Sequence, residues 1–165
     1  MISSYCKINL SLRVIKKTRN GLHDIQTNSF LLNICDQINI RKYKKKKDLI
    51  VFKGQFKKMI KKSKNSLSET LFLLRKKKLI KKNTFYKVTV NKRIPVFSGL
   101  GGGTSNAASL LRYFLKEKFN PKMINIFEKK IGSDLRLFVF KQTFQKNLKT
   151  LIKYKKKFNF HFILV

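Results

Sequence analysis

The sequence is poor in acidic residues: seven of its 165 side chains are carboxylates, against 40 lysines and arginines. It also lacks the patterns of several broad protein classes. No run of about 18 apolar residues is present, which excludes a membrane-spanning helix, and the first residues lack the segments of a signal peptide. Cys6 and Cys35 have neither metal-ligand spacing nor a disulfide framework, so we interpret both as small buried side chains. These absences predict a cytoplasmic protein.

The formal net charge of +33 is typical of a nucleic-acid-binding protein. The lysines, however, are spread through most segments instead of forming one stripe. Lys, Asn, Ile and Phe are also enriched together, as in proteins encoded by A+T-rich DNA. Mutational bias and selection for contact with polyanions both remain open. With either origin, the charge predicts nonspecific attraction of phosphate-bearing metabolites and RNA, which weakens as salt rises.

Apolar periodicity predicts one α+β domain. Ser66 and Glu69 have the spacing of a capping box, and Asn120-Pro121 has the form of a helix start. The Asn-Gly pair that ends at Gly21 predicts a tight turn from residue 19. Strands are expected at 5–14, 25–34, 37–41, 49–52, 85–90, 135–140 and 158–165, and helices at about 66–78, 104–117 and 120–131.

Four of the seven glycines lie within five positions, at Gly99 and Gly101–Gly103, directly before a helix pattern. Backbone without Cβ atoms can approach an anion closely, and the N-terminus of a helix adds free N–H groups. Thr104 and Ser105 supply hydroxyls where a phosphate or Mg²⁺ would sit. No lysine follows the glycines as in a P-loop, and the spacing differs from the dinucleotide-binding fingerprint. The segment predicts a phosphate site of another kind; the alternative is a glycine-rich turn without a ligand.

The stretch 95–108, PVFSGLGGGTSNAA, resembles the ATP loop of the GHMP kinases, and in particular that of the diphosphocytidyl-methylerythritol kinases. Residues 7–10 with 21–27, and residues 131–134, are similar to two further motifs of that family. The resemblance extends from residue 7 to about residue 140. It implies a ribosomal protein S5 domain 2-like α+β fold, with ATP and Mg²⁺ as cofactors. The implied reaction is phosphorylation of a hydroxyl of 4-diphosphocytidyl-2-C-methyl-D-erythritol, in the methylerythritol phosphate route to isoprenoid precursors.

The resemblance also implies residue roles. Asp134, which follows a Gly-Ser turn, matches the catalytic aspartate, and Lys7, inside an apolar alternating strand, matches the lysine that polarises the substrate hydroxyl. Asn9 and His23 match substrate-binding residues, whereas His161 is interpreted as structural. Mg²⁺ would be carried by ATP, with the Thr104 or Ser105 hydroxyl nearby. The expected ATP-binding residues are Pro95, Val96, Phe97, Ser98, Gly99, Leu100, Gly101, Gly102, Gly103, Thr104 and Ser105.

The chain departs from the family pattern at three places. Leu22 stands where an aromatic side chain is usual, and Arg136 replaces a proline, which is expected to loosen the loop at Asp134. No glycine follows Gly132, so the family's third glycine-rich motif is absent. We therefore expect residues 1–165 to be the N-terminal, ATP-binding domain without the C-terminal GHMP domain. Self-association or a partner chain is then expected to cover the apolar segment 158–165.

Two alternatives remain beside the kinase: a noncatalytic basic RNA-binding protein, and an inactive nucleotide-binding remnant. Convergence of Lys7, Asp134 and the glycine loop on one cleft would favour the enzyme. Lysines gathered on one face away from that loop would favour RNA binding.

Overall fold

The computed structural model describes residues 1–18, 21, 23–60 and 65–163. Parts of two predicted elements (residues 19, 20, 164 and 165), and Leu22, lie outside these ranges. No helix of the described residues is long and apolar enough to cross a membrane. In chain order the elements are β1 (Ile2–Lys17), β2 (His23–Tyr43), β3 (Leu49–Gly54), the 3-10 helix η1 (Lys57–Met59), α1 (Ser66–Lys76), β4 (Phe85–Lys92), α2 (Gly102–Leu115), η2 (Lys116–Lys118), α3 (Pro121–Ile131), η3 (Ser133–Phe138), β5 (Gln142–Gln145) and β6 (Leu151–Lys153).

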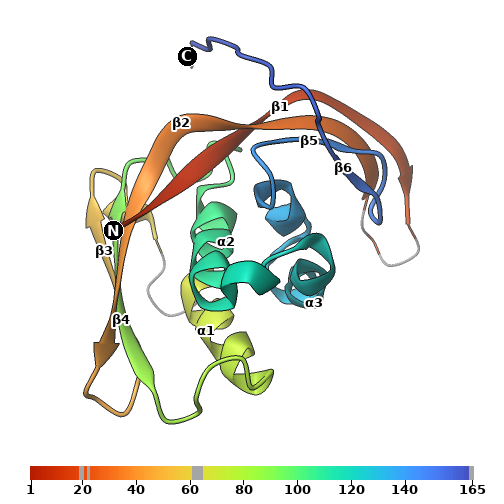
Figure 1. The fold of residues 1–165 in the computed structure, drawn as a ribbon. Helices are drawn as coiled ribbons and strands as arrows, with labels where there is room; N and C mark the ends of the chain where they lie inside the picture. The colour runs from red at the N-terminus through yellow and green to blue at the C-terminus, as the bar shows by residue number, and fades with distance from the viewer. Residues whose placement is uncertain (19–20, 22, 61–64, 164–165) are drawn as a thin grey trace.

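The strands form one mixed sheet with the order β3-β4-β2-β5-β6, and β1 also pairs with β2. β3 runs parallel to β4, and the other pairs are antiparallel. β1 and β2 make a long ribbon whose register shifts at three places, the first between Tyr5 and Lys7. Such irregularities bend and twist a ribbon, and Figure 1 shows the ribbon arching over the helices. β1 thereby passes directly over α2.

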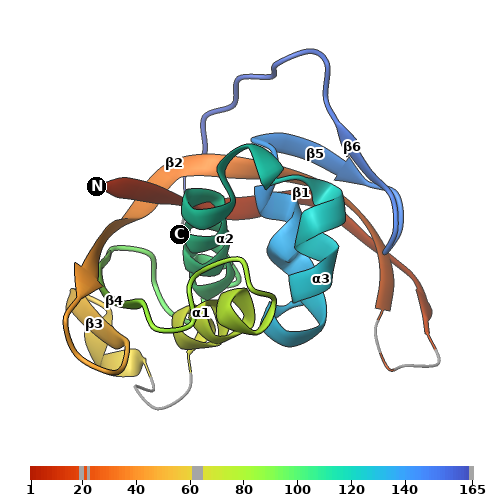
Figure 2. The same cartoon turned by 60° about the horizontal axis from the view of Figure 1, so that its bottom comes forward.

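The three helices gather on one side of the ribbon, as Figure 2 shows. Val88 and Val90 are alternate residues of β4. Both side chains are fully buried and pack with residues of α1 and α2. A second group of buried side chains joins α1, α2, α3 and η3. Its fully buried members are Leu74, Ala107, Leu111, Ile124, Phe127 and Leu135. The predicted α+β class is confirmed, and the core lies between the sheet and the helices.

The structure corrects several predicted elements. Residues 133–138 form η3 instead of a strand, and β2 continues through Asp36 without the expected break. The N-cap of α1 is Asn65 instead of Ser66, because the Asn65 side chain accepts hydrogen bonds from the backbone N–H groups of the first turn. α2 begins at Gly102, two residues earlier than predicted.

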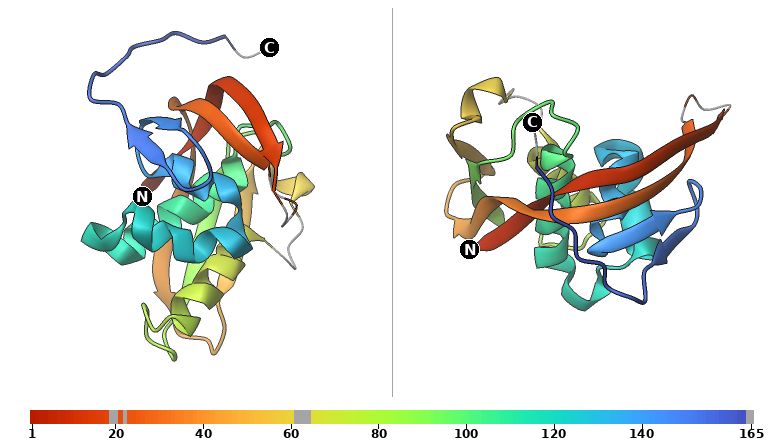
Figure 3. Two further views of the ribbon diagram at one scale, coloured as in Figure 1. Left: turned by 90° about the vertical axis from the view of Figure 1, so that its right-hand side faces the viewer. Right: turned by 90° about the horizontal axis from the view of Figure 1, so that it is seen from above.

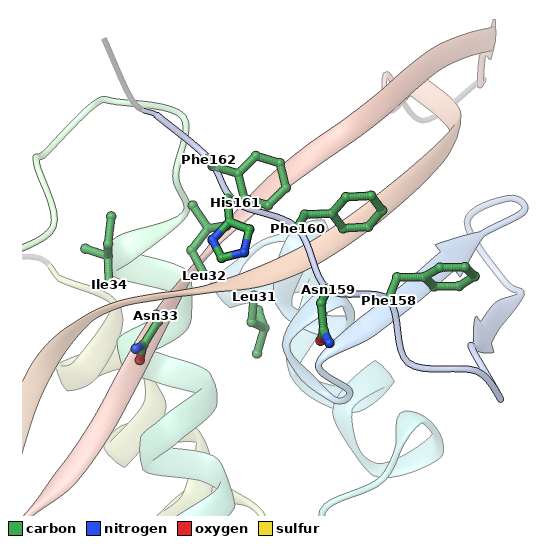
Figure 4. Close-up of a pocket in the computed structure, with 9 residues that line it drawn as sticks. All are labelled: Leu31, Leu32, Asn33, Ile34, Phe158, Asn159, Phe160, His161 and Phe162. Atoms are coloured by element: carbon green, nitrogen blue, oxygen red, sulfur yellow. The ribbon is translucent and has the colours of Figure 1, made fainter.

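The predicted strand at 158–165 is also wrong over the part that the structure describes, since residues 158–163 form no strand. This segment crosses over β2, as the right-hand view of Figure 3 shows. Figure 4 shows it beside Leu31–Ile34, with which residues 158–162 line a cavity of about 610 Å³. The Phe160 ring packs edge-on against Phe30, with 5.3 Å between the ring centroids. Aromatic contacts, together with two hydrogen bonds between the Gln142 side chain and the Phe158 backbone, hold this segment on the sheet without a strand ladder.

Candidate functional site

The glycine-rich loop connects the end of β4 to the start of α2. Gly99 and Gly101 have φ angles of +75° and +69°, the left-handed region in which glycine carries no steric penalty. Gly101 is the N-cap of α2. The first N–H groups of a helix lack intrahelical acceptors and lie at the positive end of its dipole. The loop thus presents backbone donors at Gly102, Gly103 and Thr104 that suit a phosphate group.

This loop lines one wall of a cavity of about 790 Å³. The loop residues at the cavity are Pro95–Gly99 and Gly101–Thr104. Three apolar side chains from β3, η1 and the residue after η1 also line the cavity, namely Phe52, Met59 and Ile60. The remaining lining residues are polar: Asn65, Ser66, Lys92, Asn106 and Asp134. Apolar side chains in the same cavity as a row of backbone donors suit a ligand with a flat apolar base and several phosphates.

Lys7 and Asp134 meet beside this loop, although they are far apart in the sequence. The Lys7 Nζ lies 3.2 Å from Asp134 Oδ2 and donates a hydrogen bond to Asn9 Oδ1, also over 3.2 Å. The Lys7 side chain is 4% exposed and that of Asp134 is 41% exposed. The lysine is therefore buried with its charge compensated, while the carboxylate reaches the cavity and is open to a ligand.

β1 carries Lys7 and also holds the glycine loop in place. The backbone N–H of Lys7 donates to the Leu100 carbonyl over 3.0 Å. The Ser105 hydroxyl donates to the Tyr5 carbonyl and lies 2.8 Å from the Ser4 hydroxyl. These bonds attach β1 to the loop and to the first turn of α2, so the lysine and the phosphate donors keep a fixed relation.

Two residues expected to contact ATP are turned elsewhere, which corrects that part of the prediction. The Ser105 hydroxyl bonds to β1, its N–H donates to the Gly101 carbonyl over 2.8 Å, and its side chain lines a separate cavity with Tyr5. Leu100 packs in a small apolar cluster with buried Cys6. Thr104 remains at the cavity, and so does the hydroxyl-bearing Ser98.

Lys92 is a cation at the loop that the sequence reasoning missed. It ends β4, lines the cavity and is 3% exposed, and its Nζ would lie 3.2 Å from a Cβ atom at Gly102. Its partner is Asp36, which is fully buried and also accepts hydrogen bonds from the N–H groups of Arg93 (2.7 Å) and Ile94 (2.9 Å). The available signal was the position of Lys92 in the buried register of β4, two residues after Val90.

Asn106 supplies a second polar feature that the sequence reasoning missed. Its side chain is 2% exposed, and its Oδ1 has no hydrogen-bond partner among the described residues. A buried acceptor without a partner is costly, and this residue lines the cavity beneath the glycine loop. The orphaned oxygen indicates that a ligand, its metal ion or a water molecule completes the site.

Of the two predicted substrate residues, the structure brings one to Lys7. Asn9 accepts the hydrogen bond from the Lys7 Nζ, as described above. His23 is exposed at the start of β2 and lies opposite Lys17 of β1. Lys17 is ten residues along β1 from Lys7, so His23 lies up to roughly 33 Å from Lys7 on an extended strand. His161 lies on the C-terminal segment beside the other cavity.

Arg136 does not loosen the loop at Asp134, contrary to the prediction. Its Nε donates to Glu128 Oε1 of α3 over 2.7 Å, and its guanidinium also donates to the Leu148 carbonyl. These bonds tie η3 to α3 and to the loop before β6. The arginine therefore supplies the constraint that a proline would give in the family pattern.

Comparisons with known proteins agree with this geometry. Residues 59–136 match the family described as GHMP kinases N terminal domain. The 4-diphosphocytidyl-2-C-methyl-D-erythritol kinase of Pelagibacter ubique is 36% identical over 99% of this chain and 58% of its own length, and that of Thermotoga maritima is 34% identical over 83% and 48%. The chain thus spans about half the length of these relatives.

Solved structures show the same fold. A crystal structure of 4-(cytidine 5'-diphospho)-2C-methyl-D-erythritol kinase superposes with a TM-score of 0.63 at 19% identity, covering 92% of this chain and 53% of that protein. A D-glycero-D-manno-heptose 1-phosphate kinase from Bacteriodes thetaiotaomicron superposes with a TM-score of 0.60 at 14% identity, covering 94% and 59%. Residues 59–136 thus match the N-terminal domain of the GHMP kinases, and the chain has the fold that these kinases share.

Proposed function

We propose that this chain binds ATP with Mg²⁺ and transfers the γ-phosphoryl group to a hydroxyl of 4-diphosphocytidyl-2-C-methyl-D-erythritol. The observation that carries the proposal is the Lys7–Asp134 pair, 3.2 Å apart at the edge of the cavity beneath the glycine loop. Phosphoryl transfer needs a positioned hydroxyl, an acceptor for its proton and positive charge around the phosphates. The names of the relatives support the choice of substrate.

Each of these requirements has a residue in the structure. Asp134 is the exposed partner of the pair and accepts the proton from the substrate hydroxyl as its oxygen attacks the γ-phosphorus and the bond to ADP breaks. Lys7 pairs with that carboxylate and polarises the hydroxyl oxygen. Asn9 fixes the Lys7 ammonium through its hydrogen bond. The N–H groups at Gly102–Thr104 and the Lys92 ammonium stabilise charge on the phosphates.

The residues present fit Mg²⁺ bound through ATP better than a metal site built by the protein. No group of three or more His, Cys, Asp or Glu side chains among the described residues could hold a metal ion. Mg²⁺ commonly keeps several waters and binds through substrate phosphates with one or two protein ligands. Thr104 and the unpartnered Oδ1 of Asn106 are the oxygens that would contact it or its waters.

Substitution of Asp134 tests the proposal. In a coupled assay of ADP release with the diphosphocytidyl substrate, Asp134→Asn is expected to lower turnover by about 10²–10⁴-fold, because a positioned general base contributes about this much. ATP affinity, measured by calorimetry, should change less than about threefold, since the phosphates are held elsewhere. Glu117→Gln, which removes an exposed carboxylate on η2, is the matched control and should leave both unchanged.

The same experiment separates the kinase from an inactive nucleotide-binding remnant. A wild-type chain that binds ATP but releases no ADP with the diphosphocytidyl substrate would be the remnant. Equal losses of turnover and ATP affinity in Asp134→Asn would assign that residue a structural role.

The partner expected at the C-terminal segment is a further part of the proposal. Phe158, Phe160 and Phe162 are 36%, 49% and 36% exposed and form a row of ring contacts along residues 158–162. Exposed aromatic rows of this kind are typical of surfaces that contact another polypeptide. We infer that self-association or a partner chain covers this row.

A further inference from the structure

Two lysine-rich runs that are about 30 residues apart in the sequence lie at the same end of the molecule. One run occupies the end of β2 and its connection to β3, and the other occupies the connection from α1 to β4. Their eleven exposed basic residues, hereafter the basic end, are Arg41, Lys42, Lys44, Lys45, Lys46, Lys47, Lys76, Lys77, Lys78, Lys81 and Lys82. Both connections lie at the bottom of Figure 1. The fold thus gathers charges that the sequence shows as scattered.

A half-buried ion pair joins the two runs. Asp48, directly after the tetra-lysine run, binds Arg75 at the end of α1 through two hydrogen bonds of 2.5 and 2.8 Å. Its Oδ1 also accepts from the Tyr86 N–H over 2.8 Å, and Arg75 donates to the Thr84 carbonyl over 2.7 Å. The strand register adds a third link, since Tyr43 lies opposite Phe85. The two runs therefore form one surface.

No ion pair among the described residues compensates the charge of the basic end. No carboxylate occurs at 41–47 or 75–87, and Asp48 is turned inward and paired. Positive side chains crowded in this way repel one another and attract a polyanion. The surface is also separate from the phosphate loop, because the two flank opposite ends of β4, which spans roughly 25 Å. ATP binding therefore does not account for it.

We propose that the basic end binds a nucleic acid through its phosphodiester backbone. No large apolar side chain is fully exposed at 41–48 or 76–87, so the surface has no anchor for insertion into a membrane. Its aromatic side chains, Tyr43, Phe85 and Tyr86, are half-buried, so we assign the contacts to the exposed lysines and arginine. Contacts to phosphates alone carry no sequence information. RNA and DNA of one sequence should accordingly bind with similar affinity.

The experiment uses the full chain and a fluorescein-labelled 16-nucleotide RNA, with anisotropy measured from 50 to 200 mM NaCl. The variant carries Lys44→Gln, Lys45→Gln, Lys46→Gln and Lys47→Gln. The control carries Lys149→Gln, Lys155→Gln, Lys156→Gln and Lys157→Gln, four exposed lysines elsewhere, so that both proteins lose four positive charges. Circular dichroism and ATP affinity verify the fold of each.

The basic-end variant should bind the RNA at least tenfold more weakly at 100 mM NaCl, and its log–log salt slope should fall by up to about 3, since each phosphate contact to a single strand contributes about 0.7. The control variant should bind the RNA with an affinity within about threefold of that of the wild type. The wild type should bind DNA of the same sequence within about threefold of its affinity for the RNA. Equal losses in the two variants would show that net charge alone attracts the RNA and would overturn the proposal. Binding to phosphatidylserine vesicles without binding to RNA would also overturn it, in favour of a membrane surface.

Discussion

Substitution of Gly101 by alanine should disrupt the site through a contact that can be located atom by atom. A Cβ atom there would lie 2.9 Å from Phe138 Cζ, and 3.3 and 3.5 Å from Cγ and Cε of Lys7. Because Cβ atoms do not approach other heavy atoms within 3.0 Å, the phenylalanine ring must shift. The Lys7 side chain, whose Cγ would be 3.3 Å away, must also give by a few tenths of an ångström, which disturbs its position beside Asp134.

The cost of this change has two parts. The φ angle of +69° places the alanine in the left-handed region, at about 1–2 kcal/mol. Overpacking against Phe138 and Lys7 adds about 1–3 kcal/mol. We expect Gly101→Ala to lower the free energy of unfolding by about 2–5 kcal/mol, the sum of the two parts, and to reduce turnover more than ATP affinity, since it displaces the lysine.

Alanine substitutions at two neighbouring glycines distinguish the backbone cost from the overpacking cost. Gly99 has a φ of +75° but no heavy atom within 4 Å of its Cβ position, so Gly99→Ala should lose only the backbone part, about 1–2 kcal/mol. Gly103 lies in α2 without a positive φ, and its nearest neighbour would be Ser66 Oγ at 3.8 Å. Gly103→Ala should be neutral or stabilise by up to about 1 kcal/mol.

Urea unfolding, ATP calorimetry and the coupled ADP assay measure all three variants. If Gly99→Ala and Gly101→Ala lose the same stability and the same turnover, the contact with Lys7 is without effect and the steric reasoning is refuted.

Three further predictions follow from other contacts. Asp36→Asn should destabilise the protein by about 3–5 kcal/mol and weaken ATP binding, because it leaves the Lys92 ammonium buried without a counter-charge; unchanged ATP affinity by calorimetry would remove Lys92 from the site. Burial raises the pKa of the Cys6 thiol to about 11 from 9.0, so the wild type should lose about 2–3 kcal/mol of stability relative to Cys6→Ala as pH rises from 9 to 11, and parallel urea-unfolding curves of the two proteins would contradict this. Self-association through the exposed aromatic row should strengthen with salt, which screens the repulsion between highly charged chains, and Phe160→Ser should abolish it; a monomer at every salt concentration in sedimentation would contradict the proposal.

Features that depend on short contiguous motifs could be predicted from the sequence, such as the glycine-rich turn and the helix that follows it. The glycine loop is read from neighbouring residues, because a phosphate-binding turn needs glycines and a helix start close together. Lys7 and Asp134 were paired through the family resemblance, and the structure places them 3.2 Å apart. That distance could not follow from periodicity, since the ribbon must arch over α2 to bring β1 to η3.

The misses have a common physical cause, which is tertiary contact overriding local preference. Residues 135–140, LRLFVF, are apolar enough for a strand, but η3 packs them against α2 and α3, while Arg136 bonds to Glu128. Asp36 favours a strand break by its residue type, yet it receives three donors from the end of β4, more than 50 residues away. Lys92 was overlooked for the same reason, because its partner is visible only in the folded chain.

The attachment of β1 to the glycine loop has a consequence for how the protein is made. Lys7 leaves the ribosome early and can pair with β2 within a short time. At 5–20 residues per second, Asp134 is synthesised roughly 6–25 s later. Until then Lys7 is a cation without its carboxylate partner. The Leu100 carbonyl and the Ser105 hydroxyl, which bond to β1, are also synthesised long after Lys7. The ribbon can therefore form first, and the Lys7–Asp134 pair forms only when the last third of the chain packs against it.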